Sequence, residues 1–401
     1  MERRRRARQV ADEDTQEVQV DRAVLRSRAT TRGVFQQYNF AGGPGALPEG
    51  VLEQTQGAIR RVPGQNGGIL AVSHRSPWFR RVVEEAETNI RELLCLPSGY
   101  HVLFLASGSS LQFPMVPMTV LRDSKRPAEY VASGYWSNKA VVEARREGRV
   151  RVLWNGRQEA FRRLPGPDEL THSRDAAYLH YVSNESVEGL QFHRLLGPKD
   201  VPRVCDMSSD FLSRPFDVKA FALIYAHTRN NLGPAGVTVA IVRDDVLAHI
   251  PSNMPGMRDS QDPAHLRAVY NTAPVLATYT TMLVTRWLRD QVGGLAEMEV
   301  SNRAKAAELY RTIDTSDGFY RGHAAPENRS LMNVVFRLPS RHLEQLFLSE
   351  AESAGFHGLT GHRSVGGIRA SIYNAVTLDA VIALCDFMEF FRARHGDEGD
   401  S

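Results

Sequence analysis

Residues 203–243 read RVCDMSSDFLSRPFDVKAFALIYAHTRNNLGPAGVTVAIVR and contain three short apolar runs separated by polar or Gly-rich segments. Short apolar runs bounded by turn-forming residues favour buried β-strands. Similar runs recur within residues 101–182, with segments of helical or loop character between them. This alternation predicts an α/β fold in which a mostly parallel central sheet is covered by helices on both faces.

Composition and length favour a globular chain of two domains. Of the 401 residues, 42% are hydrophobic and 24% are charged, which is ordinary for a protein with a large core. Residues 1–36 lack hydrophobic periodicity and are predicted to form a disordered tail. From about residue 297 the pattern changes to helix, strand, helix, strand, helix, as expected for a smaller second domain.

Charge and cysteine usage exclude several functional classes. The net charge is +3, and the first 33 residues, with nine Arg and six Asp or Glu, account for it. The remaining body is close to neutral, so we expect no nucleic-acid partner. No apolar segment is long enough to suggest an export signal or a membrane span. Cys95, Cys205 and Cys385 lie far apart, so we expect neither a metal site nor disulfides, and a cytoplasmic location.

In parallel sheets, ligands bind beyond the carboxyl ends of the strands. Five segments directly follow the apolar runs and are therefore candidates for a site: Ser107–Ser110, Gly134–Trp136, Asn184–Ser186, Asp206 and His227–Asn231.

Three of these candidates have both a structural and a functional interpretation. Asp206 could cap a helix or turn, or it could face the cationic nitrogen of a bound ring. Trp136 could be a core residue or a stacking platform. The small residues of the segment SGSS, at 107–110, could form a plain turn or cradle a phosphate with backbone N–H groups.

Two clusters of arginine and histidine suggest an anionic ligand. One is SHR at residues 73–75, and the other is GHRSVGGIRASIYNA at residues 361–375. Each arginine alone suits an exposed surface. Together, in loops flanked by Gly and Ser, they suggest a substrate with two anionic ends, because guanidinium groups pair with carboxylates and phosphates.

Taken together, these segments resemble the phosphoserine aminotransferases, which are class V aminotransferases of the fold-type-I pyridoxal-phosphate proteins. The resemblance runs from about Tyr38 to about Gly396 and includes six further strings. They are NFAGGPGALP, AVSHRS, ASGYW, HYVSNES, NNLGPAG and YNTAP. It implies a large cofactor-binding domain over 50–296 and a small domain over 37–49 and 297–397. It also implies pyridoxal or pyridoxamine phosphate as cofactor and a homodimer with shared active sites.

The resemblance assigns cofactor-binding roles residue by residue. Trp136 would stack on the pyridine ring, Asp206 would pair with its nitrogen, and Ser186, where the family has Thr, would hydrogen-bond the ring oxygen. The cofactor phosphate would be bound by two groups of residues. They are Ser109 and Ser110 with Arg229 from one subunit, and Asn271 and Thr272 from its partner.

The substrate would be a small anionic amino acid or keto acid. Arg369 would bind its α-carboxylate. His362 and Arg363, with His74 and Arg75 across the dimer interface, would hold its distal phosphate or carboxylate.

The sequence departs from the family at the lysine that forms the Schiff base. The family segment G-A-Q-K-N-x-G-P-A-G corresponds here to HTRNNLGPAG, so Asn230 takes the lysine position, Arg229 the glutamine position and His227 the first glycine position. No lysine lies between Lys219 and Lys305, so a small register shift recovers none. The family's Gly-Arg pair at the phosphate loop is also replaced, by Ser109 and Ser110, and Arg229 could supply the lost positive charge.

An asparagine amide is neither nucleophilic nor basic, so ordinary transamination is expected to be slow. His227 and Lys139 are the candidate substitutes, although the first could be a core histidine and the second a solvated surface lysine. The leading hypothesis is an enzyme that binds the cofactor noncovalently and acts on phosphoserine or a related anionic amino acid or keto acid, by weak transamination or altered chemistry. The alternatives are a catalytically silent binding protein and a conventional enzyme in which Asn230 is an engineered replacement.

Overall fold

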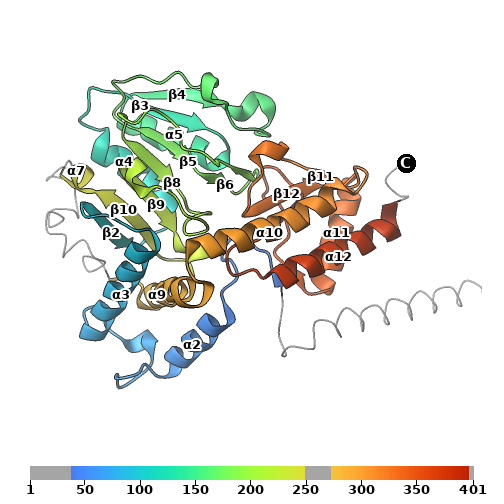
Figure 1. Cartoon of the computed structure of the whole chain (residues 1–401), viewed down its shortest axis with the longest axis horizontal. Helices are drawn as coiled ribbons and strands as arrows, with labels where there is room; N and C mark the ends of the chain where they lie inside the picture. The colour runs from blue at the N-terminus through green and yellow to red at the C-terminus, as the bar shows by residue number, and fades with distance from the viewer. Residues whose placement is uncertain (1–37, 249–271, 397–401) are drawn as a thin grey trace, which may run out of the picture.

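The computed structural model describes residues 38–248 and 272–396. Its centre is a seven-stranded sheet with the order β2-β10-β9-β8-β5-β3-β4 (Figure 1). The strands are β2 (Tyr100–Leu105), β3 (Ala128–Ala132), β4 (Val150–Asn155), β5 (Leu179–Val182), β8 (Arg203–Asp206), β9 (Leu223–His227) and β10 (Thr238–Arg243).

The sheet confirms the predicted α/β fold with mostly parallel strands. β9, β8, β5, β3 and β4 run parallel to one another, whereas β10 is antiparallel to both of its neighbours. A parallel connection needs a crossover of a dozen or more residues, and residues 228–237 are too few to provide one. The chain instead returns directly through α6 (Thr228–Asn231) and a turn in which Gly233 and Gly236 have positive φ angles.

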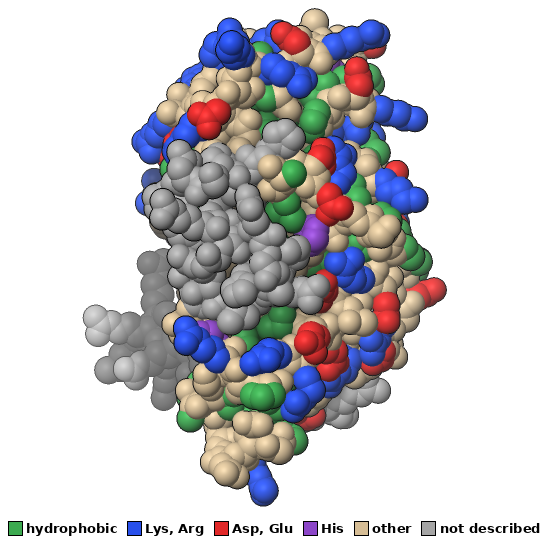
Figure 2. All heavy atoms as spheres, turned by 90° about the vertical axis from the view of Figure 1, so that its left-hand side faces the viewer, with side chains coloured by type: hydrophobic (Ala, Val, Ile, Leu, Met, Phe, Trp, Pro, Cys, Tyr) green, Lys and Arg blue, Asp and Glu red, His purple; other side chains and the backbone are tan. Residues whose placement is uncertain are grey.

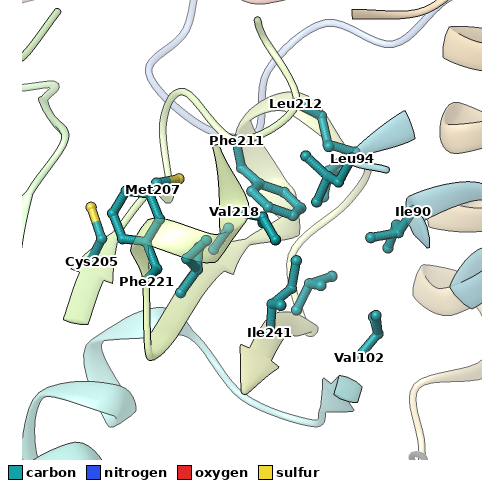
Figure 3. Close-up of a cluster of buried hydrophobic side chains, with 14 of the residues drawn as sticks. Ile90, Leu94, Val102, Cys205, Met207, Phe211, Leu212, Val218, Phe221 and Ile241 are labelled. Carbon is teal, nitrogen blue, oxygen red and sulfur yellow. The ribbon is translucent and has the colours of Figure 1, made fainter. Parts of the chain in front are cut away.

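Helices cover both faces of this sheet. On one face α3 (Pro77–Leu93) and α9 (Val275–Trp287) contribute to a core that includes Val239 and Ile241 of β10. On the other face α4 (Gln112–Val120) and α5 (Tyr135–Glu147) pack on a second core that includes Ala240 and Val242. Successive strand residues point to opposite faces, so β10, whose four central residues Val239–Val242 are all apolar, is buried on both faces. Figure 3 shows part of the first core, to which Ile90, Leu94, Val102 and Ile241 contribute side chains.

A smaller structural unit lies beside the sheet (Figure 1). It contains an antiparallel sheet of β11 (Arg321–Gly322), β12 (Asn333–Arg337) and β14 (Ile368–Ser371), together with α10 (Leu295–Asp314), α11 (Arg341–Ser353) and α12 (Leu378–His395). Phe336, Phe347 and Phe391 belong to its separate core, and Phe40 joins them from the N-terminal segment. We therefore propose that residues 37–49 belong with 297–397 in a small domain and that 50–296 form the large one. The predicted tail at 1–36 lies outside the described residues.

The remaining elements are short or peripheral. They are β1 (Tyr38–Asn39), which pairs in parallel with β13 (Phe356–His357), and β6 (Asn184–Glu185), which pairs with β7 (Leu190–Gln191). Helices α2 (Glu49–Arg60) and α7 (Asp244–Leu247), the 3-10 turns η1 (Ile69–Ala71) and η2 (Ser109–Leu111), and the π-helical turn η6 (Leu288–Val292) complete the parts used below.

Three features of the described part concern membrane spans, basic surface patches and metal sites. None of its helices is both long and apolar enough to cross a membrane. On the face shown in Figure 2, Lys and Arg side chains are interspersed with Asp and Glu and do not form one basic patch. Among the described residues, no three His, Cys, Asp or Glu side chains gather in a way that could hold a metal ion.

Candidate active site

Strand-end segments surround a cavity of about 270 Å³ at the carboxyl edge of the parallel strands. Its lining comes from the ends of β5, β8 and β9, the loop after β2, the start of α5 and the segment containing β6. The lining residues are Gly108, Ser109, Ser110, Trp136, Lys139, Val182, Asn184, Ser186, Asp206, Ser208, Ser209, His227, Arg229 and Asn230. Sequence reasoning named most of these positions, but it missed Ser208 and Ser209, which follow Asp206 directly.

Asp206 is a buried carboxylate at the end of β8, with 3% of its surface exposed. Its Oδ1 accepts a hydrogen bond of 2.8 Å from the Ser208 backbone N–H. Burial raises the Asp206 pKa to about 7, although the bonds from Ser208 oppose this. None of the described Lys, Arg or His side chains forms an ion pair with it. A buried carboxylate without a cation is costly, and a ligand carrying a cationic N–H would relieve that cost.

Trp136 lies in the first turn of α5 and lines the cavity. Its indole Nε1 donates to Ser186 Oγ over 3.1 Å, which fixes the ring next to the segment after β6. The indole is therefore anchored by its edge, and the aromatic ring forms part of the cavity wall.

Two buried glutamates position the start of α5. Glu185 accepts from the backbone N–H groups of Trp136 (3.0 Å) and Ser137 (2.9 Å), and Glu188 accepts from that of Tyr135 (2.9 Å). These are the first N–H groups of the helix, which lack partners within it. Burial raises the pKa of Glu185, and burial together with the Glu185 charge raises that of Glu188. Sequence reasoning placed Glu185 inside the candidate segment Asn184–Ser186 but gave it no role, and it missed Glu188. The available signal was two acidic residues, three apart, in the otherwise uncharged string HYVSNESVEGLQF, residues 180–192.

At the other end of the cavity, His227 and Arg229 lie beside the Gly-Ser loop. The Arg229 backbone N–H donates to His227 Nδ1 over 3.2 Å, which leaves the proton of the neutral ring on Nε2. A Cβ added at Gly108 would lie 3.3 Å from His227 Nε2, so this nitrogen lies against the loop. Burial, followed by the Arg229 charge, lowers the His227 pKa to about 4, so the ring is neutral at neutral pH.

Asn230 is buried at the cavity, with 6% of its surface exposed. Its Nδ2 donates to Tyr373 Oη over 2.8 Å, while its Oδ1 has no hydrogen-bond partner. The N-terminal turn covers this position, since Gly45 N donates to Arg229 O over 2.8 Å. A Cβ at Gly45 would approach Asn230 O to 2.5 Å, so only glycine fits there. An unsatisfied buried amide oxygen next to a cavity suits a polar ligand.

The arginine and histidine cluster at residues 361–375 contacts Ser186, which lines the cavity. Arg369, on β14, donates from Nη1 to Ser186 O over 3.3 Å, and its buried Nε has no partner. The His362 ring lies 4.7 Å from the Tyr135 ring, centroid to centroid. Side-chain hydrogen bonding to the Tyr135 hydroxyl, mainly from Lys139 and to a lesser extent from Arg363, lowers the Tyr135 pKa. The Arg363 guanidinium therefore lies close to that hydroxyl. Burial, followed by Arg369, Arg363 and Lys139, lowers the His362 pKa.

Among the described residues, six predicted site residues do not line this cavity: Arg369, His362 and Arg363, placed above, and His74, Arg75 and Thr272. His74 and Arg75 lie in the loop between η1 and α3 and do not line the cavity of their own chain. Thr272 is exposed shortly before α9, and Asn271 lies outside the described residues. The resemblance assigned His74, Arg75, Asn271 and Thr272 to the partner subunit, so their roles stay predictions.

Comparison with known proteins identifies the family. The model of the class-V aminotransferases matches residues 37–384. A phosphoserine aminotransferase from Syntrophobacter fumaroxidans is 48% identical over 360 residues, which cover 90% of this chain and 99% of that protein. The solved phosphoserine aminotransferase from Bacillus circulans subsp. alkalophilus is 43% identical, with a TM-score of 0.86 over 90% of this chain and 99% of the other. A pyridoxal-phosphate-bound phosphoserine aminotransferase from Trichomonas vaginalis is 32% identical, with a TM-score of 0.82 over 88% of this chain and all of the other.

This chain belongs to the phosphoserine aminotransferase family. The predicted family and fold class are thereby confirmed, and the chain is an aminotransferase-family enzyme. The cofactor of this family is pyridoxal phosphate, and the cavity fits it. The unpaired buried carboxylate of Asp206 suits a pyridinium nitrogen, the Trp136 ring suits a flat heterocycle, and the Ser186 hydroxyl suits a ring oxygen. That Asn230 takes the lysine position of this family stays a prediction.

Proposed function

We propose that this enzyme binds pyridoxal or pyridoxamine phosphate without a covalent bond from residue 230. The observation that carries the proposal is the buried, unpaired Asp206, which shares one cavity with Trp136 and Asn230. When bound, the cofactor supplies an electron sink for bonds at the substrate α-carbon. Asp206 would hold its ring nitrogen, and Trp136 would stack on its ring.

The phosphate of the cofactor has a separate set of proposed partners. Ser109 and Ser110 offer backbone and hydroxyl groups, and the Nε2–H of neutral His227 points toward the same loop. Arg229 adds a positive charge in place of the arginine that the family carries in this loop. Asn271 and Thr272 of a partner subunit would complete the set. This arrangement assigns His227 to phosphate binding, because a ring whose pKa is about 4 is a weak base at neutral pH.

The proposed substrate is phosphoserine or a related anionic amino acid or keto acid. Arg369 contacts Ser186, which lines the cavity, and its buried Nε has no hydrogen-bond partner, which suits the α-carboxylate. His362 and Arg363 lie next to Tyr135, whose ring neighbours that of Trp136, and suit the distal anion. The named activity of the relatives supports this substrate class.

Asn230 would make the reaction slow or alter it. Loss of a positioned acid–base group costs roughly 10²–10⁴-fold in rate, and loss of covalent activation adds to that. Conventional phosphoserine transamination is the second candidate, and the 48% identity over nearly the whole of a curated relative favours it. A silent binding protein is the third, and no feature of the cavity favours it.

Calorimetric titration tests the cofactor proposal. We expect both pyridoxal and pyridoxamine phosphate to bind to the wild type. Asp206→Ala should weaken binding at least tenfold, whereas Asn230→Ala, matched in truncation, should change it only a few-fold. Absence of binding at millimolar concentration would rule the proposal out. A coupled assay of glutamate release from phosphoserine and 2-oxoglutarate then separates slow from ordinary transamination.

A further inference from the structure

Lysine is rare in this chain and its placement is informative. The sequence contains 49 lysine and arginine residues, and only five are lysines. They are Lys125, Lys139, Lys199, Lys219 and Lys305. Arginine provides a permanent charge but no nucleophile, whereas a lysine amine can lose its proton and attack a carbonyl carbon. A lysine at the cofactor cavity is therefore chemically distinct from the cations used elsewhere in the chain.

Lys139 is the lysine at that cavity. It lies in α5 one turn after Trp136, so both side chains project from the same face of the helix. Its Nζ lies 5.4 Å from the centroid of the Trp136 ring and 4.8 Å from that of the Tyr135 ring. A cofactor ring stacked on Trp136 would therefore have this amine within the reach of a flexible four-carbon side chain.

The Lys139 side chain also lies where the inner cavity adjoins a larger outer one. Lys139 lines the inner cavity together with Asp206 and Asn230, and it lines an adjoining outer cavity of about 970 Å³. Only Ser110 shares this double position among the described residues. No carboxylate of the described part forms a salt bridge with Lys139, so the amine is not held by a surface ion pair.

The other four lysines are placed differently. Lys305 is fully buried and donates to three backbone carbonyls, at Ile372, Tyr373 and Val376. Lys125, Lys199 and Lys219 are exposed and line neither cavity.

We propose that Lys139 is the amine that bonds reversibly to the aldehyde carbon of pyridoxal phosphate, in place of a lysine at position 230, where this chain has Asn230. The ammonium group first releases one proton to water, which its exposure allows. The nitrogen lone pair then attacks the carbonyl carbon, a C=N bond forms, and the oxygen leaves as water with the two protons of the neutral amine. The inference rests on the proposed function, and it adds a reversible bond from α5 to the noncovalent contacts.

Reductive trapping tests the inference without any turnover. The wild type is incubated with pyridoxal phosphate, reduced with borohydride and digested with a glutamate-specific protease, and the peptides are weighed by mass spectrometry. We expect the phosphopyridoxyl mass on the peptide containing Lys139, at least tenfold above Lys125, Lys199 and Lys219. Lys139→Arg keeps the charge and removes the nucleophile, so it should lose the label and weaken the calorimetric affinity for pyridoxal phosphate more than that for pyridoxamine phosphate, which has no aldehyde. Lys125→Arg is the matched control and should keep the label.

The outcomes separate this inference from the function on which it rests. Cofactor binding with no label, or with equal label on the exposed lysines, would overturn the role of Lys139 and leave noncovalent binding intact. No cofactor binding by calorimetry would overturn both. Asn230→Lys serves as the positive control, because it should move part of the label to residue 230.

Discussion

At the scale of single residues, the buried carboxylate of Asp206 lowers the folding stability of the cofactor-free protein. In the unfolded chain it ionises above its ordinary pKa of 3.8, whereas burial raises the folded value to about 7. The ionised form is therefore penalised in the fold. The penalty is fully present above pH 7 and is lost as the pH falls through 7 toward 3.8.

Asp206→Asn should therefore stabilise the cofactor-free protein at pH 8. The pKa difference of about 3 units corresponds to at most roughly 4 kcal/mol, at 1.36 kcal/mol per unit. The gain in melting temperature should shrink at pH 5, and cofactor affinity should fall at both values. Thermal denaturation of wild type and variant across pH measures this. If the variant were less stable at pH 8, a cation outside the described residues would already neutralise Asp206.

A second residue-scale prediction concerns Asn230→Lys. An amine introduced there should form a borohydride-reducible bond to pyridoxal phosphate, and some phosphoserine–2-oxoglutarate turnover should appear. Arg229 and His227 flank the position, and a neighbouring cation depresses the pKa of a new lysine, so the gain need not reach that of a native relative. The assay is best done in the Lys139→Arg background. A bond without turnover would mean that the substrate has diverged, and no bond despite binding would mean that residue 230 is not the lysine position.

At the scale of elements, α10 is linked to the site through Lys305. Its Nζ donates to the carbonyls of Ile372, Tyr373 and Val376 over 3.1, 2.8 and 2.9 Å. The Tyr373 hydroxyl in turn receives the Asn230 amide and donates to Gly42 O over 3.1 Å. One buried lysine amine, whose pKa burial lowers to about 7, therefore orders the segment whose Tyr373 contacts Asn230.

Lys305→Met should be strongly destabilising. It keeps most of the side-chain volume but removes the amine donor from the buried carbonyls of Ile372 and Val376, whereas Tyr373 O keeps the Val376 backbone N–H at 2.9 Å. One unsatisfied buried group costs about 1–3 kcal/mol. We expect a loss of about 2 kcal/mol or more in the free energy of unfolding, measured by urea denaturation, and a several-fold loss of cofactor affinity. Lys219→Met removes an exposed lysine and should change stability little. A neutral Lys305→Met would show that water replaces the amine.

The same elements show what the sequence could and could not reveal. The positions of Trp136, Asp206 and Asn230 around one cavity follow from strand ends that meet at one edge of a sheet, so short-range patterns were sufficient. The contacts of Glu188 with Tyr135 and of Lys305 with Tyr373 join segments far apart in the chain, and no local periodicity encodes them. The antiparallel direction of β10 could have been predicted from the short connection at residues 228–237, but sequence reasoning did not use its length.

At the scale of the whole molecule, several predicted ligand-binding residues lie outside the cavity of their own chain. His74, Arg75 and Thr272 lie away from its cavity, although the family resemblance assigns them to ligand binding. Large apolar side chains are exposed near the first two, with Leu70 in η1 72% exposed and Leu52 and Ile59 in α2 each 45% exposed. Leu52 and Ile59 are seven residues apart and share a helix face. Exposed apolar surface of this kind marks an interface, and a second copy of the chain would supply the missing residues.

We therefore predict a two-fold symmetric homodimer that includes α2, η1 and the loop after it. Light scattering should give twice the chain mass of 44.8 kDa at micromolar concentration. Leu70→Asp should shift the protein toward monomer and weaken phosphoserine binding, because a buried charge opposes the interface and the partner residues are lost together. Val300→Asp, at a residue 64% exposed on α10, is the matched control and should remain dimeric. Arg75→Ala then separates assembly from site sharing, since it should keep the dimer but reduce phosphoserine affinity about tenfold. A monomeric wild type would refute the dimer, and a dimer indifferent to Arg75→Ala would show that each chain binds its substrate alone.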